Sequence, residues 1–133
     1  MVIENFIYTY ISHEEEYNKG ETILKEGSSG NWVYVILEGA VKVKKMTGKG
    51  LVTVDTLKEG DIFGEMVLWQ LGKVSRTASI VAENKVKVAL LDTELLIKEY
   101  ETISPRLKSL FESLIHRLAV TTQRAVKLAT DDI

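Results

Sequence analysis

Glycines divide the first part of the chain into short segments rich in β-branched and aromatic residues. Seven of the nine glycines mark these divisions and stand at Gly20, Gly27, Gly30, Gly39, Gly48, Gly60 and Gly72. Because glycine disfavours the interiors of helices and strands and favours turns, no long helix fits between these positions. Short strands joined by turns at this spacing are typical of an all-β sandwich or barrel. We therefore expect a mainly β fold up to about residue 92.

Most segments between the glycines alternate apolar and polar residues. In residues 40–45, Val41 and Val43 fall on one face and lysines fall on the other, and residues 51–57 and 86–90 repeat this pattern. Residues 32–37, WVYVIL, are apolar at every position, which predicts a central strand covered on both sides. Residues 46–50, MTGKG, predict a hairpin tip and lack the rest of a phosphate-binding loop.

The apolar spacing changes from two to about 3.6 residues after Leu91, which marks the end of the β region. Asp92 is a suitable N-cap, so we expect a short helix over residues 92–103. Ser104 followed by Pro105 predicts the start of a second helix, which continues without interruption to about residue 131. This second helix is longer than a small β domain needs for cover.

One face of the second helix carries a regular stripe of mostly apolar residues. Its members are spaced alternately three and four residues apart and are Phe111, Leu114, Leu118, Thr121, Ala125 and Leu128. This heptad spacing is typical of helices that pair with another helix. We expect the stripe to form the seam of a homodimer, and packing onto the chain's own β domain is the alternative.

Composition argues against several classes of protein. The 133 residues suit one domain, and the absence of cysteine excludes disulfides and thiolate zinc sites. The net charge of −2 disfavours nucleic-acid binding by this chain, since such surfaces need a basic excess. No apolar stretch approaches the ~20 residues of a membrane span, and the N-terminus lacks the features of a secretory signal. We expect a cytoplasmic protein without membrane contact.

Residues 60–82 contain two charged residues suited to a binding site. In a predicted strand, Arg76 lies on the same face as Ala78, Ile80 and Ala82, so an arginine heads the apolar side. A buried guanidinium needs an anion, because burial of an unpaired charge costs several kcal/mol. Either Glu65 or an anionic ligand could supply this anion. Glu65 and Arg76 alone do not decide between an internal salt bridge and a ligand site.

A longer pattern resembles the cyclic-nucleotide-binding domain superfamily over about Tyr17 to Asp92. The residues that carry the resemblance are Gly20, Glu21, Ile23, Glu26, Gly27, Gly30, Tyr34, Ile36, Gly39, Val41, Val43, Gly60, Asp61, Phe63, Gly64, Glu65, Arg76, Thr77, Ala78 and Ser79. The resemblance implies a double-stranded β-helix, or jelly-roll β-roll, with flanking helices and a long C-terminal helix. It also implies that residues 60–82 form the phosphate-binding cassette.

The same resemblance implies a role for each cassette residue. Glu65 would accept a hydrogen bond from the ribose 2′-hydroxyl and Arg76 would bind the cyclic phosphate. Gly64 and Met66 would lend backbone contacts, and Thr77 would add a hydroxyl contact. The chemistry agrees, because the guanidinium fork engages phosphate oxygens bidentately and a carboxylate accepts from a hydroxyl. We expect cAMP as the ligand, cGMP as the alternative, and neither a metal nor a cofactor.

Residues 117–129, RLAVTTQRAVKLA, resemble the dimer helix of the bacterial catabolite activator protein family. By that resemblance Thr121 would contact the adenine of its own subunit, Thr122 would reach the ligand of the partner subunit, and Arg117 would lie near Glu65. A DNA-reading helix-turn-helix follows this helix in that family. Because the sequence stops at Ile133, a regulatory fragment and a free-standing sensor are both open interpretations.

Two departures from the family pattern leave open a module that keeps the fold and dimer but binds no nucleotide. Val67 stands where most members have a small residue, and the segment from Glu65 to Arg76 is a residue or two longer than usual. Trp69 in this segment could stack on a purine or serve as a surface hydrophobe. An enzyme of the cupin type needs a cluster of histidine and carboxylate ligands, which His13 and His116 do not provide. We expect no catalytic activity.

Overall fold

The computed structural model describes residues 9–28, 32–64 and 78–131, except for the side chains of residues 119, 122, 123, 126 and 129–131. One antiparallel sheet contains, in spatial order, β1 (Ile11–Tyr17), β8 (Val86–Leu91), β3 (Val33–Glu38) and β6 (Ile62–Phe63). The other contains β2 (Thr22–Leu24), β7 (Ser79–Ala82), β4 (Ala40–Thr47) and β5 (Gly50–Lys58).

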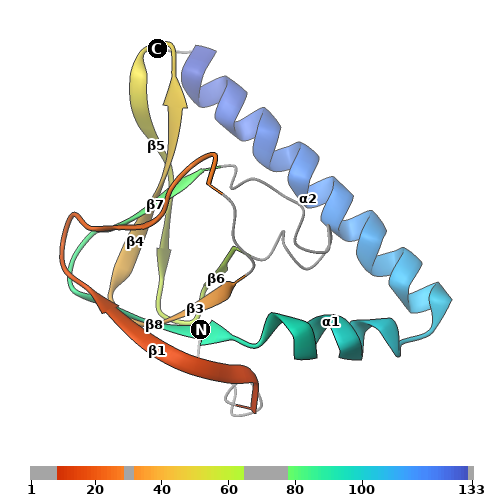
Figure 1. Cartoon of the computed structure of the whole chain (residues 1–133). Helices are drawn as coiled ribbons and strands as arrows, with labels where there is room; N and C mark the ends of the chain where they lie inside the picture. Colours follow the sequence, from red (N-terminus) through yellow and green to blue (C-terminus); the bar gives the residue numbers. More distant parts are fainter. Residues whose placement is uncertain (1–8, 29–31, 65–77, 132–133) are drawn as a thin grey trace.

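Two helices, α1 (Thr93–Glu101) and α2 (Pro105–Asp131), follow the sheets. Figure 1 shows the sheets as a roll on the left, α1 leaving it to the right, and α2 running back diagonally. The upper end of α2 lies beside the hairpin of β4 and β5. The expected β-roll with a short helix and a long C-terminal helix is confirmed.

Strand β3 is covered on both faces, as its uninterrupted apolar sequence predicts. Tyr34 and Ile36 belong to the buried cluster between the two sheets. Val33 and Val35 belong to a second buried cluster on the opposite face, against which Leu96 of α1 packs. Each fully buried aliphatic side chain contributes about 1.5–3 kcal/mol relative to an exposed one. The strand lacks an alternating pattern because neither of its faces meets water.

The β4–β5 hairpin is the one predicted at residues 46–50. Its register runs from Ala40 opposite Lys58 to Thr47 opposite Gly50, with an irregularity between Val43 and Lys44. At the tip, the Thr47 hydroxyl donates to the Gly50 carbonyl oxygen at 2.8 Å. The same Oγ1 accepts from the backbone N–H of Lys49 at 3.1 Å. The glycine-containing segment therefore closes a turn between two paired strands.

The roll begins at Ile11, earlier than the family resemblance that starts near residue 17. Strand β1 pairs antiparallel with β8 at the edge of its sheet. Its exposed face includes Glu14, whose Oε2 lies 3.4 Å from the Lys87 ammonium nitrogen. Charged side chains on an edge strand discourage pairing with other chains. The edge position explains why β1 carries a run of acidic residues and no alternating apolar pattern. Its backbone pairing with β8 nevertheless makes it part of the sheet.

Both predicted helix N-caps are confirmed. The Asp92 carboxylate accepts from the backbone N–H of Leu95 at 3.0 Å at the start of α1. The Ser104 hydroxyl accepts from the backbone N–H of Leu107 at 3.2 Å, and Pro105 opens α2. Each cap satisfies a backbone donor that has no partner within the helix. The two caps separate α1 from α2 and set where each helix leaves the preceding chain.

Replacing the α1 cap is expected to lower stability by a modest, measurable amount. Asp92→Ala removes the acceptor for Leu95, and loss of such a cap costs about 1 kcal/mol of the free energy of unfolding. Asp92→Asn keeps a side-chain oxygen and should lose much less. Urea unfolding followed by circular dichroism measures both variants. Equal losses in the two variants would show that the cap hydrogen bond is not what Asp92 contributes.

Candidate functional site

The entrance to the candidate cassette is anchored on strand β3. The backbone N–H of Gly60 donates to the Ile36 carbonyl at 2.8 Å, and the Ile36 N–H donates to the Asp61 carbonyl at 3.0 Å. Phe63 is buried and its ring stacks on Tyr34, with centroids 4.8 Å apart and planes 4° apart. These contacts hold the chain against one sheet up to Gly64.

Gly64 follows β6 and adopts a conformation that favours glycine. Its φ is +77°, in the region that side chains with a Cβ rarely adopt. The family resemblance expects close backbone approach to a ligand at this residue. The contact of Gly64 with a ligand stays a prediction.

The exit of the cassette is strand β7, in the other sheet. Ile80 and Ala82 are 5% and 2% exposed, which confirms that they form the interior face. The chain thus passes from β6 in one sheet to β7 in the other between residues 64 and 78. The strand starts at Ser79, so the expectation that Arg76 opens it concerns residues outside the described part.

Most of the predicted ligand contacts fall between these two anchors. Glu65, Met66, Arg76 and Thr77 lie outside the described residues, as do Val67 and Trp69. Their assigned roles, and the alternative of an internal Glu65–Arg76 salt bridge, stay predictions.

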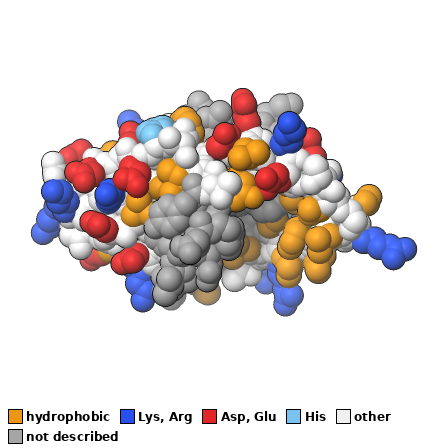
Figure 2. Space-filling model, turned by 90° about the horizontal axis from the view of Figure 1, so that it is seen from below, with side chains coloured by type: hydrophobic (Ala, Val, Ile, Leu, Met, Phe, Trp, Pro, Cys, Tyr) orange, Lys and Arg blue, Asp and Glu red, His pale blue; other side chains and the backbone are white. Residues whose placement is uncertain are grey.

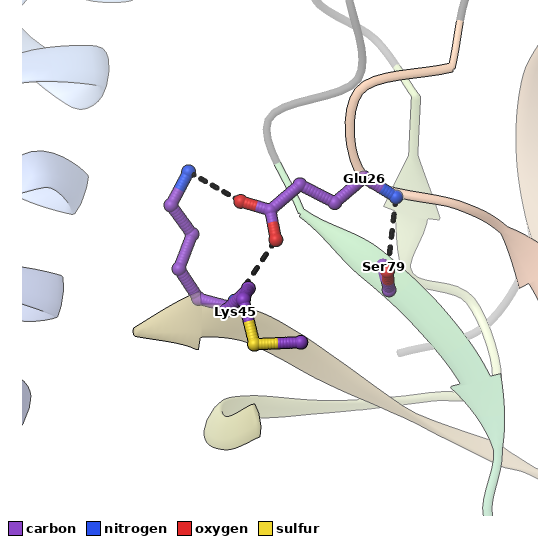
Figure 3. Close-up of polar contacts among 4 residues, drawn as sticks. Glu26, Lys45 and Ser79 are labelled. Carbon is purple, nitrogen blue, oxygen red and sulfur yellow. Dashed lines mark hydrogen bonds and ion pairs between the residues drawn. The ribbon is translucent and has the colours of Figure 1, made fainter. Parts of the chain in front are cut away.

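Figure 3 shows a polar cluster at the exit of the cassette, centred on Glu26 in the turn after β2. The backbone N–H of Glu26 donates to the Ser79 hydroxyl oxygen at 2.9 Å. Its carboxylate Oε1 lies 2.9 Å from the Lys45 ammonium nitrogen, and Oε2 accepts from the backbone N–H of Met46 at 2.9 Å. Glu26 therefore joins the turn to β4 and β7. The sequence pattern contains Glu26 and Ser79 without indicating this contact.

The cluster favours the ionised form of Glu26. Partial burial opposes ionisation, but the hydrogen bond from Met46 and the charge of Lys45 outweigh it, so the pKa of Glu26 is lowered from its ordinary value of 4.5. A carboxyl group whose pKa is lower in the folded state than in the unfolded state stabilises the folded chain at pH values above the unfolded-state pKa. That contribution is lost as the pH falls through the folded-state pKa.

We accordingly expect the stability difference between the unsubstituted chain and Glu26→Gln to be constant near neutral pH and to shrink below about pH 4. Thermal unfolding at a series of pH values measures it. A difference that is the same at pH 3 and pH 7 would show that the Glu26 charge does not contribute. Glu14→Gln, at the ion pair with Lys87 on the other sheet, is the control.

Helix α2 presents two of the predicted helix contacts to solvent. Arg117 and Thr121 are both exposed and lie four residues apart, on one face of the helix. Thr122 lies in the same helix, and its side chain is outside the described set. Because Glu65 is also outside that set, the expected proximity of Arg117 to Glu65 stays a prediction.

The predicted seam of α2 is exposed along its length. Phe111, Leu114, Leu118 and Leu128 are 37%, 49%, 57% and 64% exposed, and Thr121 and Ala125 are exposed as well. The alternative that the seam packs onto the chain's own roll is therefore not observed. Figure 2 shows hydrophobic side chains gathered towards the right, the side of the two helices. The homodimer itself stays a prediction.

Leu107 continues the seam towards the start of α2, which the sequence reasoning missed. It lies four residues before Phe111 and is 40% exposed. The same alternation of three and four residues could have identified it. The exposed stripe thus begins close to the first turn of the helix.

The two histidines lie on different elements, β1 and α2. His13 of β1 packs edge-on against Trp32 with ring centroids 5.2 Å apart, and His116 is exposed on α2. Within residues 9–28, 32–64 and 78–131, no group of three histidine or carboxylate side chains is placed to hold a metal. In the same described part of the chain, neither helix combines the length and apolar character needed to cross a membrane.

The described geometry defines a β-roll class of module, in which two four-stranded sheets precede a short and a long helix, and β6 and β7, on either side of residues 65–77, belong to different sheets. The cyclic nucleotide-binding domain family matches residues 14–102. Since that match covers more than half of the sequence, the chain belongs to the cyclic nucleotide-binding domain family.

Similar proteins include regulatory subunits of protein kinases. The cAMP-dependent protein kinase regulatory subunit of Yarrowia lipolytica is 39% identical over 72 residues, which are 54% of this chain and 18% of the relative. That of Debaryomyces hansenii is 43% identical over 77 residues, which are 58% of this chain and 16% of the relative. The chain therefore spans less than a fifth of the length of these relatives.

Several solved structures of similar fold are described as bound to a cyclic nucleotide. The cAMP-bound form of the EAL enzyme Bd1971 has a TM-score of 0.74 and 27% identity, covering 90% of this chain and 30% of that one. The cAMP-bound PfPKA-R has a TM-score of 0.63 and 28% identity, covering 89% of this chain and 37% of that one. These relatives support the family as a whole and do not single out the catabolite activator branch.

Proposed function

We propose that the chain is a cytoplasmic, non-catalytic sensor module that binds cAMP and changes how α2 packs in a homodimer. The observation that carries the proposal is the family match over residues 14–102, which includes both anchored ends of the cassette, Gly64 and Ser79. The cAMP-bound structures of similar fold support the choice of ligand.

In this proposal the cassette supplies complementary groups to each polar part of the nucleotide. Arg76 binds the cyclic phosphate through two guanidinium N–H groups, and Glu65 accepts from the ribose 2′-hydroxyl. Gly64 and Met66 contribute backbone contacts near the phosphate, and Thr77 adds a hydroxyl contact. A ligand without the 2′-hydroxyl would leave the Glu65 carboxylate without its donor, which provides selectivity.

The helix α2 extends the site in the proposed dimer. Thr121 contacts the adenine, Thr122 reaches the ligand of the partner subunit, and Arg117 lies near Glu65. Ligand binding changes helix packing only if the ligand contacts the two packing states differently. The exposed seam from Phe111 to Leu128 supports a helix partner, and its resemblance to the catabolite activator dimer helix is the reason for proposing a second copy.

Titration calorimetry with cAMP, cGMP and linear AMP tests the proposed ligand. We expect cAMP to bind at least about tenfold more tightly than AMP, whose open phosphate has a different charge and shape. Tighter binding of cGMP than of cAMP would assign the site to cGMP. Absence of heat with both cyclic nucleotides, on a folded sample, would overturn the proposal.

The second candidate is a module that keeps the fold and dimer but binds no nucleotide. Val67 favours it, because its extra methyl groups stand where most of the family has a small residue. Val67→Ala separates the two candidates, since it should leave affinity nearly unchanged if the native cassette already binds. Whether the module acts alone or as part of a DNA-binding regulator is decided by the length of the encoding reading frame.

A further inference from the structure

Glu26 contacts residues on two neighbouring strands at the end of the roll where the chain leaves the cassette (Figure 3). We propose that Glu26 is a positioning residue for the nucleotide site, fixing the start of β7 just downstream of Arg76. This inference rests on the proposed function, and it assigns to Glu26 an effect on ligand affinity without direct contact with the ligand.

The start of β7 is held by neighbouring segments on both sides. On one side Ser79 lies opposite Lys44 of β4. On the other side the ladder with β2 ends at the pair Leu24 and Ile80. Beyond that pair, the backbone N–H of Glu26 donates to the Ser79 hydroxyl at 2.9 Å. A backbone-to-side-chain hydrogen bond therefore continues the contact from β2 to the first residue of β7.

Glu26 is itself held by its turn and by the contacts of its carboxylate. Its turn is closed by the Ser28 N–H, which donates to the Lys25 carbonyl at 3.1 Å, and Gly27 has a φ of +82°. The carboxylate then bridges two successive residues of β4, Lys45 and Met46. Hydrogen bonds to a charged acceptor are stronger than neutral ones.

Partial burial together with a second hydrogen bond to the carboxylate distinguishes this pair from an ordinary surface ion pair. The side chains of Glu26 and Lys45 are 24% and 33% exposed. An exposed ion pair contributes little to stability. Here the Glu26 carboxylate also accepts a hydrogen bond from the Met46 N–H. Its removal therefore deprives Met46 of this acceptor and Lys45 of this negative charge. The turn is then held to the roll mainly by its own backbone.

The contacts of Glu26 are expected to affect ligand affinity through Arg76. Arg76 precedes Ser79 by three residues in the sequence. Because Arg76 binds the cyclic phosphate in the proposed function, we expect that binding to depend on how firmly the start of β7 is held. A binding group that must be ordered on association loses affinity, whereas one held in advance does not. Loosening the Glu26 turn should therefore weaken phosphate binding while the rest of the roll remains folded.

The experiment compares two glutamates that each pair with a lysine. One pair involves β4 of one sheet, and the other joins β1 and β8 of the other sheet. Glu26→Ala should weaken cAMP binding about tenfold, the loss typical of one hydrogen-bonded charged group. Glu14→Ala, which removes the β1 carboxylate 3.4 Å from the Lys87 ammonium nitrogen, should change affinity less than about twofold. Glu26→Gln keeps an acceptor for Met46 and should recover part of the affinity. Calorimetry is performed below the unfolding transition of every variant.

A double-variant cycle shows whether Glu26 acts through β7. Ser79→Ala should weaken binding in the unsubstituted chain and have less than about twofold further effect in Glu26→Ala. Amide hydrogen exchange without ligand should increase at residues 78–82 in Glu26→Ala and not in Glu14→Ala.

Equal affinities for Glu26→Ala and Glu14→Ala would overturn the inference, even if Glu26→Ala is less stable. Additive effects of Ser79→Ala and Glu26→Ala would likewise exclude an action through β7. If the unsubstituted chain binds neither cyclic nucleotide, the proposed function fails. The exchange measurement then still decides whether Glu26 holds the start of β7, so the two failures are distinguishable.

Discussion

Arg76→Ala is expected to weaken cAMP binding by roughly 2–5 kcal/mol, which is the usual loss for one partner of a desolvated, hydrogen-bonded charge pair. In the proposed site the guanidinium is the main cation facing the cyclic phosphate, so its removal leaves the ligand anion poorly compensated. Titration calorimetry measures the change. Arg106→Ala, at an exposed position in the first turn of α2, is the control and should bind as the unsubstituted chain does.

The same variant separates the ligand site from an internal salt bridge. If Glu65 already neutralises Arg76 and the cavity is filled, Arg76→Ala lowers the stability of the protein and leaves the affinity for cAMP unchanged. That result would contradict the assignment of the phosphate-binding residue. Arg76→Lys provides a further comparison, because a point charge without the planar fork should recover only part of the affinity.

Leu118→Glu is expected to convert dimers into monomers. Leu118 lies in the middle of the exposed seam and is 57% exposed in the single chain. In a symmetric helix pair the substitution places two carboxylates opposite each other, and such like-charge contacts cost several kcal/mol. Sedimentation velocity should therefore show monomers at concentrations where the unsubstituted chain is dimeric.

Ser113→Glu is the matched control for the seam. It adds the same charge to the same helix at an exposed position outside the heptad stripe, so the dimer should persist. Dimers that survive Leu118→Glu would place the interface elsewhere. An unsubstituted chain that sediments as a monomer with and without cAMP would contradict the homodimer directly.

Local signals in the sequence were sufficient for most of the elements. The caps at Asp92 and Ser104 were predictable because a side-chain acceptor next to a helix start acts on backbone donors only a few residues away. The hairpin tip at residues 46–50 was predictable for the same reason. Strand β1 was not, because its acidic residues occupy a sheet edge and only its backbone pairing with β8 makes it part of the roll.

The candidate site was predictable only in part. The family pattern predicted a backbone contact between Gly64 and the ligand, which stays a prediction, and the structure adds that Gly64 has a φ of +77°. It assigned no role to Glu26, whose partners Met46 and Ser79 are 20 and 53 residues away in the sequence. A contact across such separations has no periodic signature, because it depends on how the two strands are placed by the rest of the fold.

The amino-acid sequence by itself determined where most strands, turns and helices occur and which of their faces are apolar, with β1 as an exception. These properties follow from side-chain periodicity and from hydrogen bonds between near neighbours. The tertiary structure alone decided that β7 lies between β2 and β4, that Glu26 joins that strand to β4, and that the seam of α2 is not covered by the roll. Such features arise when distant segments pack together, since burial and pairing between them depend on the whole arrangement rather than on any local pattern.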